Sequence, residues 1–333
     1  MNAIVMKKDG SVYYTEVPNP LLKSGQVLLR VAACGICGTD MHVHKGMANS
    51  WSLPGIIGHE LAGTVVECAP DVTAVETGEA VTIQPLVSCG ICDACISGRT
   101  NLCRKIRLIG GEIPGGFAEY IAVPAESVIP LPAGMPVEQG ALAEPAATAV
   151  HAVNRLGGRR YKRAVVFGAG AIGLLILSVL RDAVEFIAVA DIDEKRLERA
   201  RRLGADAVLH SAREDVSARA LELSCGKPYG LAVDAAGLSA TRLQGLSLLA
   251  SGGDFLFVAL GDVKTEVNFL QLVTGELRLF GTQCHTKDDF ALALDMIADG
   301  RIDYEQIVTQ LPLSRGVEAF ENPRMGVKLH LLP

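Results

Sequence analysis

The stretch Val165-Val166-Phe167-Gly168-Ala169-Gly170-Ala171-Ile172-Gly173 joins a short apolar run to the spacing G-x-G-x-x-G. The apolar run predicts a buried strand, and the Leu/Ile-rich residues after the glycines predict a buried helix. In such a turn the first glycine makes the bend, the second admits a pyrophosphate, and the third lets helix and strand pack. The helix N-terminus favours the negative charge. We therefore expect a dinucleotide site at Gly168, Gly170, Ile172 and Gly173.

A second sign of such a site is an acidic residue at the end of the next strand. Asp191 follows the apolar run at 186–190 and stands 23 positions after Gly168. A carboxylate at this place accepts hydrogen bonds from the hydroxyls of the adenosine ribose and repels a 2′-phosphate. The sequence therefore predicts NAD as the cofactor in preference to NADP. Arg196 keeps NADP open as an alternative, because a nearby guanidinium can offset part of that repulsion.

The pattern of predicted strands and helices differs between parts of the chain. Between about 163 and 283, short apolar strands alternate with helices, which predicts a doubly wound parallel sheet. From residue 1 to about residue 143, strand-like runs punctuated by Gly, Pro, Asn and Asp predict an irregular antiparallel β domain. After about residue 281 we expect one helix and a mixed tail. The predicted fold class is α/β with two domains.

Composition narrows the function further. The 333 residues are enough for two domains, and a net charge of -6 without a basic block argues against nucleic-acid binding. Charged residues arrive too early for a signal-peptide core, so we expect a cytoplasmic protein whose nine cysteines are reduced. The uncharged run at 164–180 reaches the lower limit for a membrane span, but its glycines indicate a strand, a turn and a helix.

Four cysteines follow the pattern C-x2-C-x2-C-x7-C between about 86 and 108, namely Cys89, Cys92, Cys95 and Cys103. Four thiolates in so short a segment can enclose one zinc ion and leave no open position, which is typical of a structural site. An iron–sulfur cluster is the main alternative. Ferredoxin-type runs, however, end in x3-Cys-Pro, whereas here the last gap is seven residues and Arg104 follows.

A second group of metal ligands is spread more widely. The segment 34–60 offers a thiol at Cys37, an imidazole at His59 and a carboxylate at Glu60, separated by glycine turns. Zinc accepts sulfur, nitrogen and oxygen donors together, and a catalytic zinc keeps one position open. The working hypothesis is that Cys37, His59 and one or both of Glu60 and Glu144 hold such an ion.

Taken together, these features resemble the zinc-dependent medium-chain alcohol dehydrogenases, and most closely their polyol (sorbitol-type) and threonine dehydrogenase branch. The likeness runs along essentially the whole chain, through Cys37-Gly38-Thr39-Asp40-x-His42, Gly58-His59-Glu60, the four cysteines, Glu144-Pro145, the glycine turn and Asp191. It implies a GroES-like catalytic domain over 1–147, a Rossmann NAD-binding domain over 148–283, and a segment over 284–333 that completes the first. It also implies two zinc ions per chain, one catalytic and one structural.

The resemblance assigns roles by position. Cys37 and His59 become ligands of the catalytic zinc. Glu60 is a ligand in some members, and Glu144 stands where members with two zinc-bound cysteines have the second. Either glutamate, or a water molecule that one of them holds, can complete the site.

The implied reaction oxidises a secondary alcohol of a polyol, sugar alcohol or sugar acid to the ketone, by hydride transfer to NAD from a zinc-bound alkoxide. Thr39 would hydrogen-bond the alcohol oxygen, and His42 would be the outer member of a proton relay. Water bound to a glutamate is the alternative proton carrier. Asp40 would support His59 or the backbone.

Two alternatives and one assembly prediction remain. An L-threonine or other amino-alcohol 3-dehydrogenase carries the same motifs, and a non-catalytic zinc-ribbon binding protein is the hypothesis from a different class. Sorbitol itself is in doubt, because Gln283-Cys284-His285 stands where sorbitol dehydrogenases have a Phe-Arg pair. The family's edge-to-edge pairing of the strand near 277–282 predicts a homodimer or a homotetramer, acting on a small molecule without nucleic acid or membrane partners.

Overall fold

Residues 1–46 and 51–333 are described by the structure, a computed structural model, and they form two units. The first comprises Met1–Ala147, Thr286–Gly300 and Val308–Pro333, and the second comprises Thr148–His285 and Arg301–Ile307. The sequence predicted that 284–333 belongs to the first domain as one piece, and here the structure differs. Helix α10 (Tyr304–Ile307) packs against α4 and α5 of the second unit, and Arg199 Nη1 donates to the Gln306 carbonyl at 2.8 Å.

The first unit is built on a seven-stranded sheet with the order β10-β6-β5-β3-β18-β17, in which β9 also pairs with β3. The strands are β3 (Gln26–Gly35), β5 (Glu60–Cys68), β6 (Ala80–Ile83), β9 (Tyr120–Pro124), β10 (Val128–Pro130), β17 (Val308–Pro312) and β18 (Lys328–Leu332). β18 runs antiparallel to β3, with His330 opposite Gly35. This pairing brings the end of the chain beside the segment that leads to Cys37.

Smaller elements complete the first unit. They are a sheet of β1 (Asn2–Met6), β2 (Val12–Glu16) and β4 (Gly55–Ile56), a ladder of β7 (Leu86–Val87) and β8 (Arg107–Leu108), and the helices α1 (Gly38–His44), α2 (Asp93–Ile96), α9 (Lys287–Ala298) and α11 (Gly316–Glu321). The core includes Ile4, Leu29, Ile57 and Phe117, which are fully buried. Helix α3 (Ala143–Asn154) begins in this unit and continues into the second.

The second unit contains a six-stranded parallel sheet with the order β13-β12-β11-β14-β15-β16. The strands are β11 (Tyr161–Phe167), β12 (Val184–Asp191), β13 (Ala207–His210), β14 (Tyr229–Asp234), β15 (Leu249–Phe257) and β16 (Arg278–Gly281). The strand order reverses between β11 and β14, and in such sheets ligands bind outside the carboxyl ends of the strands at this point. The predicted doubly wound fold is confirmed.

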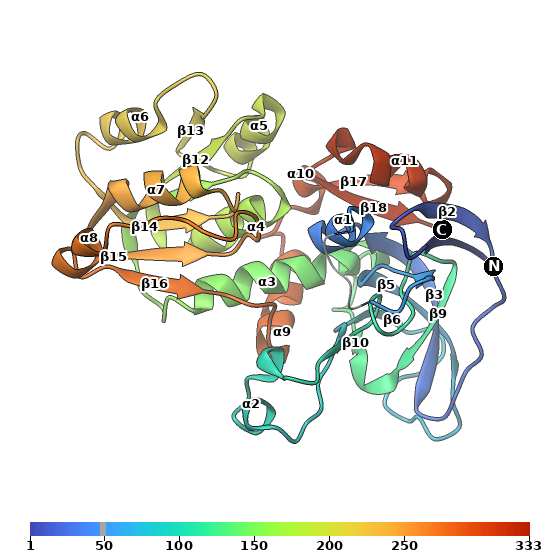
Figure 1. Cartoon of the computed structure of the whole chain (residues 1–333). Helices are drawn as coiled ribbons and strands as arrows, with labels where there is room; N and C mark the ends of the chain where they lie inside the picture. Colours follow the sequence, from blue (N-terminus) through green and yellow to red (C-terminus); the bar gives the residue numbers. More distant parts are fainter. Residues whose placement is uncertain (47–50) are drawn as a thin grey trace. The chain divides into compact units, whose positions relative to one another are not determined.

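Helices pack against the strands of this sheet (Figure 1). They are α4 (Ala171–Leu180), α5 (Glu194–Arg202), α6 (Val216–Leu223) and α7 (Ser239–Leu248). The short helix α8 (Phe269–Thr274) places Leu272 against the core of the same unit. The apolar run at 164–180 forms the end of β11, the glycine turn and α4, as expected. Within 1–46 and 51–333, no helix has both the length and the apolar character needed to cross a bilayer.

Candidate metal and nucleotide sites

Three predicted metal ligands from two separate segments converge in the first unit. One ligand atom each of Cys37, His59 and Glu60 lies within 4.8 Å of the others. The sheet explains this meeting, because Gly35 at the end of β3 pairs with Glu60 at the start of β5. His59 and Glu60 are buried, with exposed fractions of 4% and 1%. A half-buried thiol together with a buried imidazole and a buried carboxylate forms a donor set that fits zinc.

Cys37 is held by the start of helix α1. Its backbone N–H donates to Asp40 Oδ2 at 2.7 Å, and its sulfur accepts from the Thr39 backbone N–H at 3.4 Å. These reciprocal contacts form a capping box that fixes the first turn of the helix. The Thr39 hydroxyl lies 3.6 Å from the same sulfur, and the Thr39 side chain is exposed. The start of α1 therefore holds the Cys37 sulfur and the Thr39 hydroxyl next to each other.

His59 faces Asp40 on one side of its ring. Asp40 is fully buried, and its Oδ1 lies 3.6 Å from His59 Nδ1. A carboxylate near one ring nitrogen fixes the orientation of a ligating histidine, so Nε2 is the nitrogen available to an ion. Burial raises the pKa of Asp40 to about 6, although His59 lowers it. Burial also lowers the pKa of His59, but Asp40 and Cys37 raise it well above its usual value.

Glu144 lies near this group but outside it. It stands in the first turn of α3, is half-buried, and does not belong to the set of ligand atoms within 4.8 Å. Burial raises the pKa of Glu144 to about 7, while the positive charge of His59 lowers it and Glu60 raises it. His42, the other residue predicted to move a proton, is half-buried in the last turn of α1.

The glycine turn in the second unit has the geometry that dinucleotide binding requires. Gly168 has φ of +98°, which favours glycine, and a Cβ at Gly173 would overlap the Gly168 carbonyl oxygen. A Cβ at Gly170, in contrast, would meet nothing within 4 Å, so this backbone is open to a ligand. Gly170 precedes α4 without a side-chain cap, and the half-buried Ile172 lies in the first turn. The free N–H groups of this turn suit a pyrophosphate.

Asp191 ends β12 beside the same turn. Its Oδ2 accepts from the Ala169 N–H at 2.7 Å, and its Oδ1 accepts from the Asp193 N–H at 2.9 Å. Arg196 Nη1 lies 4.0 Å from Asp191 Oδ2. Each carboxylate oxygen can accept a further bond, so the position suits the ribose hydroxyls. The sequence-predicted cofactor residues are thus all gathered around one turn.

Comparison with known proteins decides the family. The family profile "Alcohol dehydrogenase GroES-like domain" matches residues 23–133, and "Zinc-binding dehydrogenase" matches 171–299. A 2-dehydro-3-deoxy-L-galactonate 5-dehydrogenase from Pseudoalteromonas atlantica is 32% identical over 90% of this chain and 88% of its own length. This chain belongs to the zinc-type alcohol dehydrogenases. The predicted superfamily and the predicted enzyme class are confirmed.

Two further relatives extend the picture of this dehydrogenase. An L-threonine 3-dehydrogenase from Pyrococcus horikoshii is 31% identical over 98% of this chain and 96% of its own length. A crystal structure of a putative zinc-binding dehydrogenase from Sinorhizobium meliloti bound to NADP has 29% identity and a TM-score of 0.92, covering 100% of this chain and 99% of that one. Zinc and a nicotinamide cofactor are therefore supported for this dehydrogenase, and a non-catalytic binding protein is disfavoured.

The four cysteines of the dehydrogenase surround one point. All four sulfurs lie within 4.8 Å of one another, with distances of 3.5 Å for Cys92–Cys95 and Cys89–Cys103 and 4.0 Å for Cys89–Cys95. A tetrahedron with metal–sulfur bonds of about 2.3 Å has edges of about 3.8 Å, so the sulfurs fit a single zinc ion. A hydrogen bond with the Cys95 backbone lowers the pKa of Cys92 to about 6, whereas burial raises that of Cys95 to about 11.

Beside Glu60 lies a buried residue that the sequence reasoning missed, Lys328. Its Nζ forms an ion pair with Glu60 Oε2 and donates to the Ile36 carbonyl at 3.0 Å, and its side chain is only 4% exposed. Burial lowers the pKa of Lys328, but the negative charges of Glu60 and Cys37 raise it above its usual value. A Cβ at Gly35 would overlap Glu60 Oε2, so this glycine makes room for the pair. The only sequence signal was a lysine within an apolar strand.

Proposed function

We propose that this dehydrogenase oxidises a secondary hydroxyl of a polyol, a sugar alcohol or a sugar acid to the ketone, with NAD as the hydride acceptor. The observation that carries the proposal is the convergence of Cys37, His59 and Glu60 in a zinc-type dehydrogenase. A relative named for a sugar-acid dehydrogenase supports the substrate class. The second candidate is L-threonine, which a relative of similar identity is named for.

A substrate panel separates the two candidates. We expect NADH formation with polyols or aldonates and little with L-threonine. The panel has to decide this, because relatives named for sugar-acid dehydrogenases and relatives named for L-threonine 3-dehydrogenases both match this chain at similar identity. Turnover of L-threonine without turnover of any polyol or aldonate would overturn the first choice. The panel is run with the zinc-loaded enzyme, since loss of the metal would silence both reactions.

Cys37, His59 and Glu60 would hold the catalytic zinc, and when bound the metal would supply a Lewis acid that lowers the pKa of the alcohol. Glu60 is the better third ligand of the two glutamates. It belongs to the converging set, and its Oε1 has no hydrogen-bond partner among residues 1–46 and 51–333. Lys328 pairs with Oε2 of Glu60, which leaves Oε1 of Glu60 available to a metal ion. Asp40 orients His59 from behind.

The remaining polar residues handle the proton. Thr39, beside the Cys37 sulfur, is placed to accept the hydroxyl proton and pass it towards His42 on the same helix. The alternative route uses water held by Glu144. The variants His42→Ala and Glu144→Gln distinguish the two routes. The rate of alcohol oxidation above neutral pH should fall in His42→Ala if the proton leaves through His42, and in Glu144→Gln if it leaves through the water held by Glu144. An equal loss in both would contradict a single route.

NAD rather than NADP is the proposed cofactor because Asp191 presents a buried carboxylate at the ribose position. Arg196 is the one basic group within 4.0 Å of that carboxylate among the described residues. A solved relative of the same fold is bound to NADP, so the choice of NAD rests on Asp191 and not on the fold. The ratio of kcat/KM for NAD and NADP measures the preference, and a ratio below one would refute it.

A homodimer or a tetramer built from dimers is the proposed assembly. Strand β16 lies at the edge of its sheet, and on α8 the side chains of Phe269, Leu270 and Val273 are 69% to 74% exposed. Unpaired strand edges and clustered apolar side chains are features that subunit contacts cover. Light scattering that finds only monomers would contradict the assembly.

A further inference from the structure

The loop that follows β14 lies beside the glycine turn. Asp234, the last residue of β14, lies opposite Phe167 of β11 in the sheet, directly beside the glycine turn. A Cβ at Gly168 would lie 2.9 Å from the carbonyl of Ala235. The segment 235–237 therefore faces the glycine turn across the point where the strand order reverses.

Asp234 ties this loop down from beneath. The carboxylate is fully buried, and its Oδ1 accepts from the backbone N–H groups of Ala236 at 3.2 Å and Gly237 at 2.8 Å. The Thr241 hydroxyl donates to the same oxygen at 2.9 Å. A buried carboxylate with these donors fixes the path of the turn, because each bond it loses would leave a polar group unpaired.

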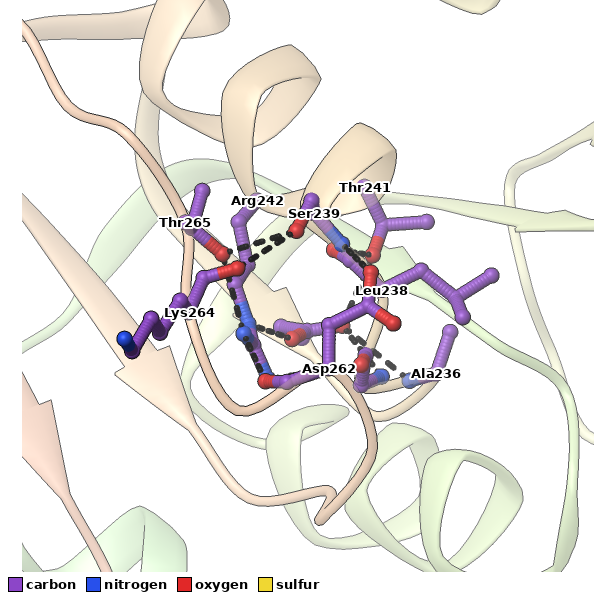
Figure 2. Close-up of polar contacts among 10 residues, drawn as sticks. Ala236, Leu238, Ser239, Thr241, Arg242, Asp262, Lys264 and Thr265 are labelled. Atoms are coloured by element: carbon purple, nitrogen blue, oxygen red, sulfur yellow. Dashed lines mark hydrogen bonds and ion pairs between the residues drawn. The ribbon is translucent and has the colours of Figure 1, made fainter.

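Arg242 connects that loop to the next one (Figure 2). Its Nε donates to Asp234 Oδ2 at 3.0 Å, and its Nη1 donates to the Asp262 carbonyl at 2.7 Å and to Thr265 Oγ1 at 3.0 Å. Its Nη2 donates to the Gly237 carbonyl at 3.3 Å. One guanidinium thus contacts the loop after β14 and the loop after β15, which the planar fork of arginine allows and a lysine does not.

Hydrogen bonds also join the two loops directly. The Asp262 N–H donates to the Gly237 carbonyl at 2.8 Å, and the Ser239 N–H donates to Asp262 Oδ2 at 2.7 Å. Apolar packing does little for the middle of the second loop, since Leu260 and Val263 are 78% and 96% exposed, whereas Val267 near its end packs against the core. The polar network around Asp234 and Arg242 is therefore what holds both loops in place.

The sheet order says which part of the dinucleotide meets these loops. If Asp191 at the end of β12 receives the adenosine ribose and the glycine turn after β11 receives the pyrophosphate, the other half extends past the ends of β14 and β15. Those ends carry the two joined loops. This step rests on the proposed function, because it assumes a dinucleotide at the glycine turn.

We propose that Asp234 and Arg242 are positioning residues for the cofactor, which hold the loops after β14 and β15 in the conformation that receives the nicotinamide half. Neither side chain needs to touch the cofactor, because the loops present their backbone to it. When the binding-competent conformation falls to a tenth of the population, the apparent Kd rises about tenfold. The network therefore sets cofactor affinity through the population of ordered loops.

The test measures the Kd of NADH by fluorescence on full-length enzyme without alcohol. For Arg242→Gln we expect a Kd raised about tenfold or more with unchanged zinc content, and for Arg242→Lys a partial recovery. The matched control is Asp254→Asn, which disrupts another fully buried aspartate, paired with Arg278 and Tyr161 away from the carboxyl ends of the strands. Its Kd should stay within about twofold of the parent.

A merely structural role would not produce the expected exchange pattern. In Arg242→Gln, amide hydrogen exchange should quicken at Ala236, Gly237 and Asp262, and saturating NADH should restore the protection. If Arg242→Gln fails to fold, Thr265→Val takes its place. It removes the Arg242–Thr265 hydrogen bond and keeps the ion pair between Arg242 and Asp234, and its Kd for NADH should rise about threefold.

Three results would overturn the proposal. They are a parent-like Kd in the folded arginine variant or in Thr265→Val, an equal rise in Asp254→Asn, or faster exchange spread over the whole unit. If the parent enzyme itself binds neither NADH nor NADPH, the proposed function fails instead, so the two failures are distinguishable.

Discussion

Removing the Lys328 charge should destabilise the zinc-free enzyme much more than the zinc-loaded one. In Lys328→Met the Glu60 carboxylate, 1% exposed, loses the cation that forms its ion pair. Zinc at Cys37 and His59 would supply positive charge to the same carboxylate. The metal should therefore compensate for the missing lysine, and zinc binding should stabilise the variant more than it stabilises the parent.

The magnitude follows from burial. Breaking a buried ion pair by removing one partner costs about 3 to 5 kcal/mol, because the other charge stays buried and uncompensated. At roughly 2 to 4 °C per kcal/mol for a unit of this size, the zinc-free Tm should fall by roughly 6 to 20 °C. Removing both charges in Lys328→Met/Glu60→Gln should recover most of the loss, because a neutral pair needs no compensation.

Calorimetry of zinc-loaded and chelated samples measures these differences. The four-cysteine lobe loses its metal equally in the chelated parent and in all chelated variants. Its effect on Tm therefore cancels when the chelated samples are compared with one another. Lys328→Arg keeps the charge and should stay within about 1 kcal/mol of the parent, since the guanidinium can pair with the same carboxylate. The reasoning fails if Lys328→Met costs less than about 1 kcal/mol without zinc, or if the double variant is no more stable than the single one.

Three further changes test other parts of the site. Cys92→Ser should lower the zinc content from two ions to one and expose the lobe to protease while the second ion stays; retention of both ions would contradict the structural site. Asp191→Ala should reduce the kcat/KM preference for NAD over NADP about tenfold or more, through loss of the ribose contacts, and an unchanged ratio would exclude that role. Asp40→Asn should weaken catalytic zinc about 10- to 100-fold, measured by competition with a chelator, because His59 loses its oriented partner. Parent-like zinc affinity would argue against that contact.

The parts of the structure that were predictable are those that local sequence encodes. The glycine turn, the strand before it and Asp191 lie within one βαβ unit, where spacing fixes geometry. The four cysteines are likewise close in sequence and could be recognised by their spacing. The gathering of Cys37, His59 and Glu60 was a hypothesis from the ligand types, and the resemblance then implied it as well. The family is now shown, while the role of each residue stays a prediction.

Other features depend on pairings that no short window contains. Lys328 reaches Glu60 because β18 pairs with β3, a contact between the end of the chain and its beginning. The Asp234–Arg242 network depends on how two loops fold over one another. The segment 301–307 joins the second unit through packing of α10, which sequence periodicity alone does not reveal.

Anomalous scattering at the zinc edge, measured on crystals of the zinc-loaded enzyme, tests the central claim most directly. Two peaks per chain are expected, one among the four cysteine sulfurs and one that Cys37 and His59 share, with Glu60 Oε1 as the third protein ligand. A single peak at the cysteines, or a second peak that neither Cys37 nor His59 touches, would contradict the account.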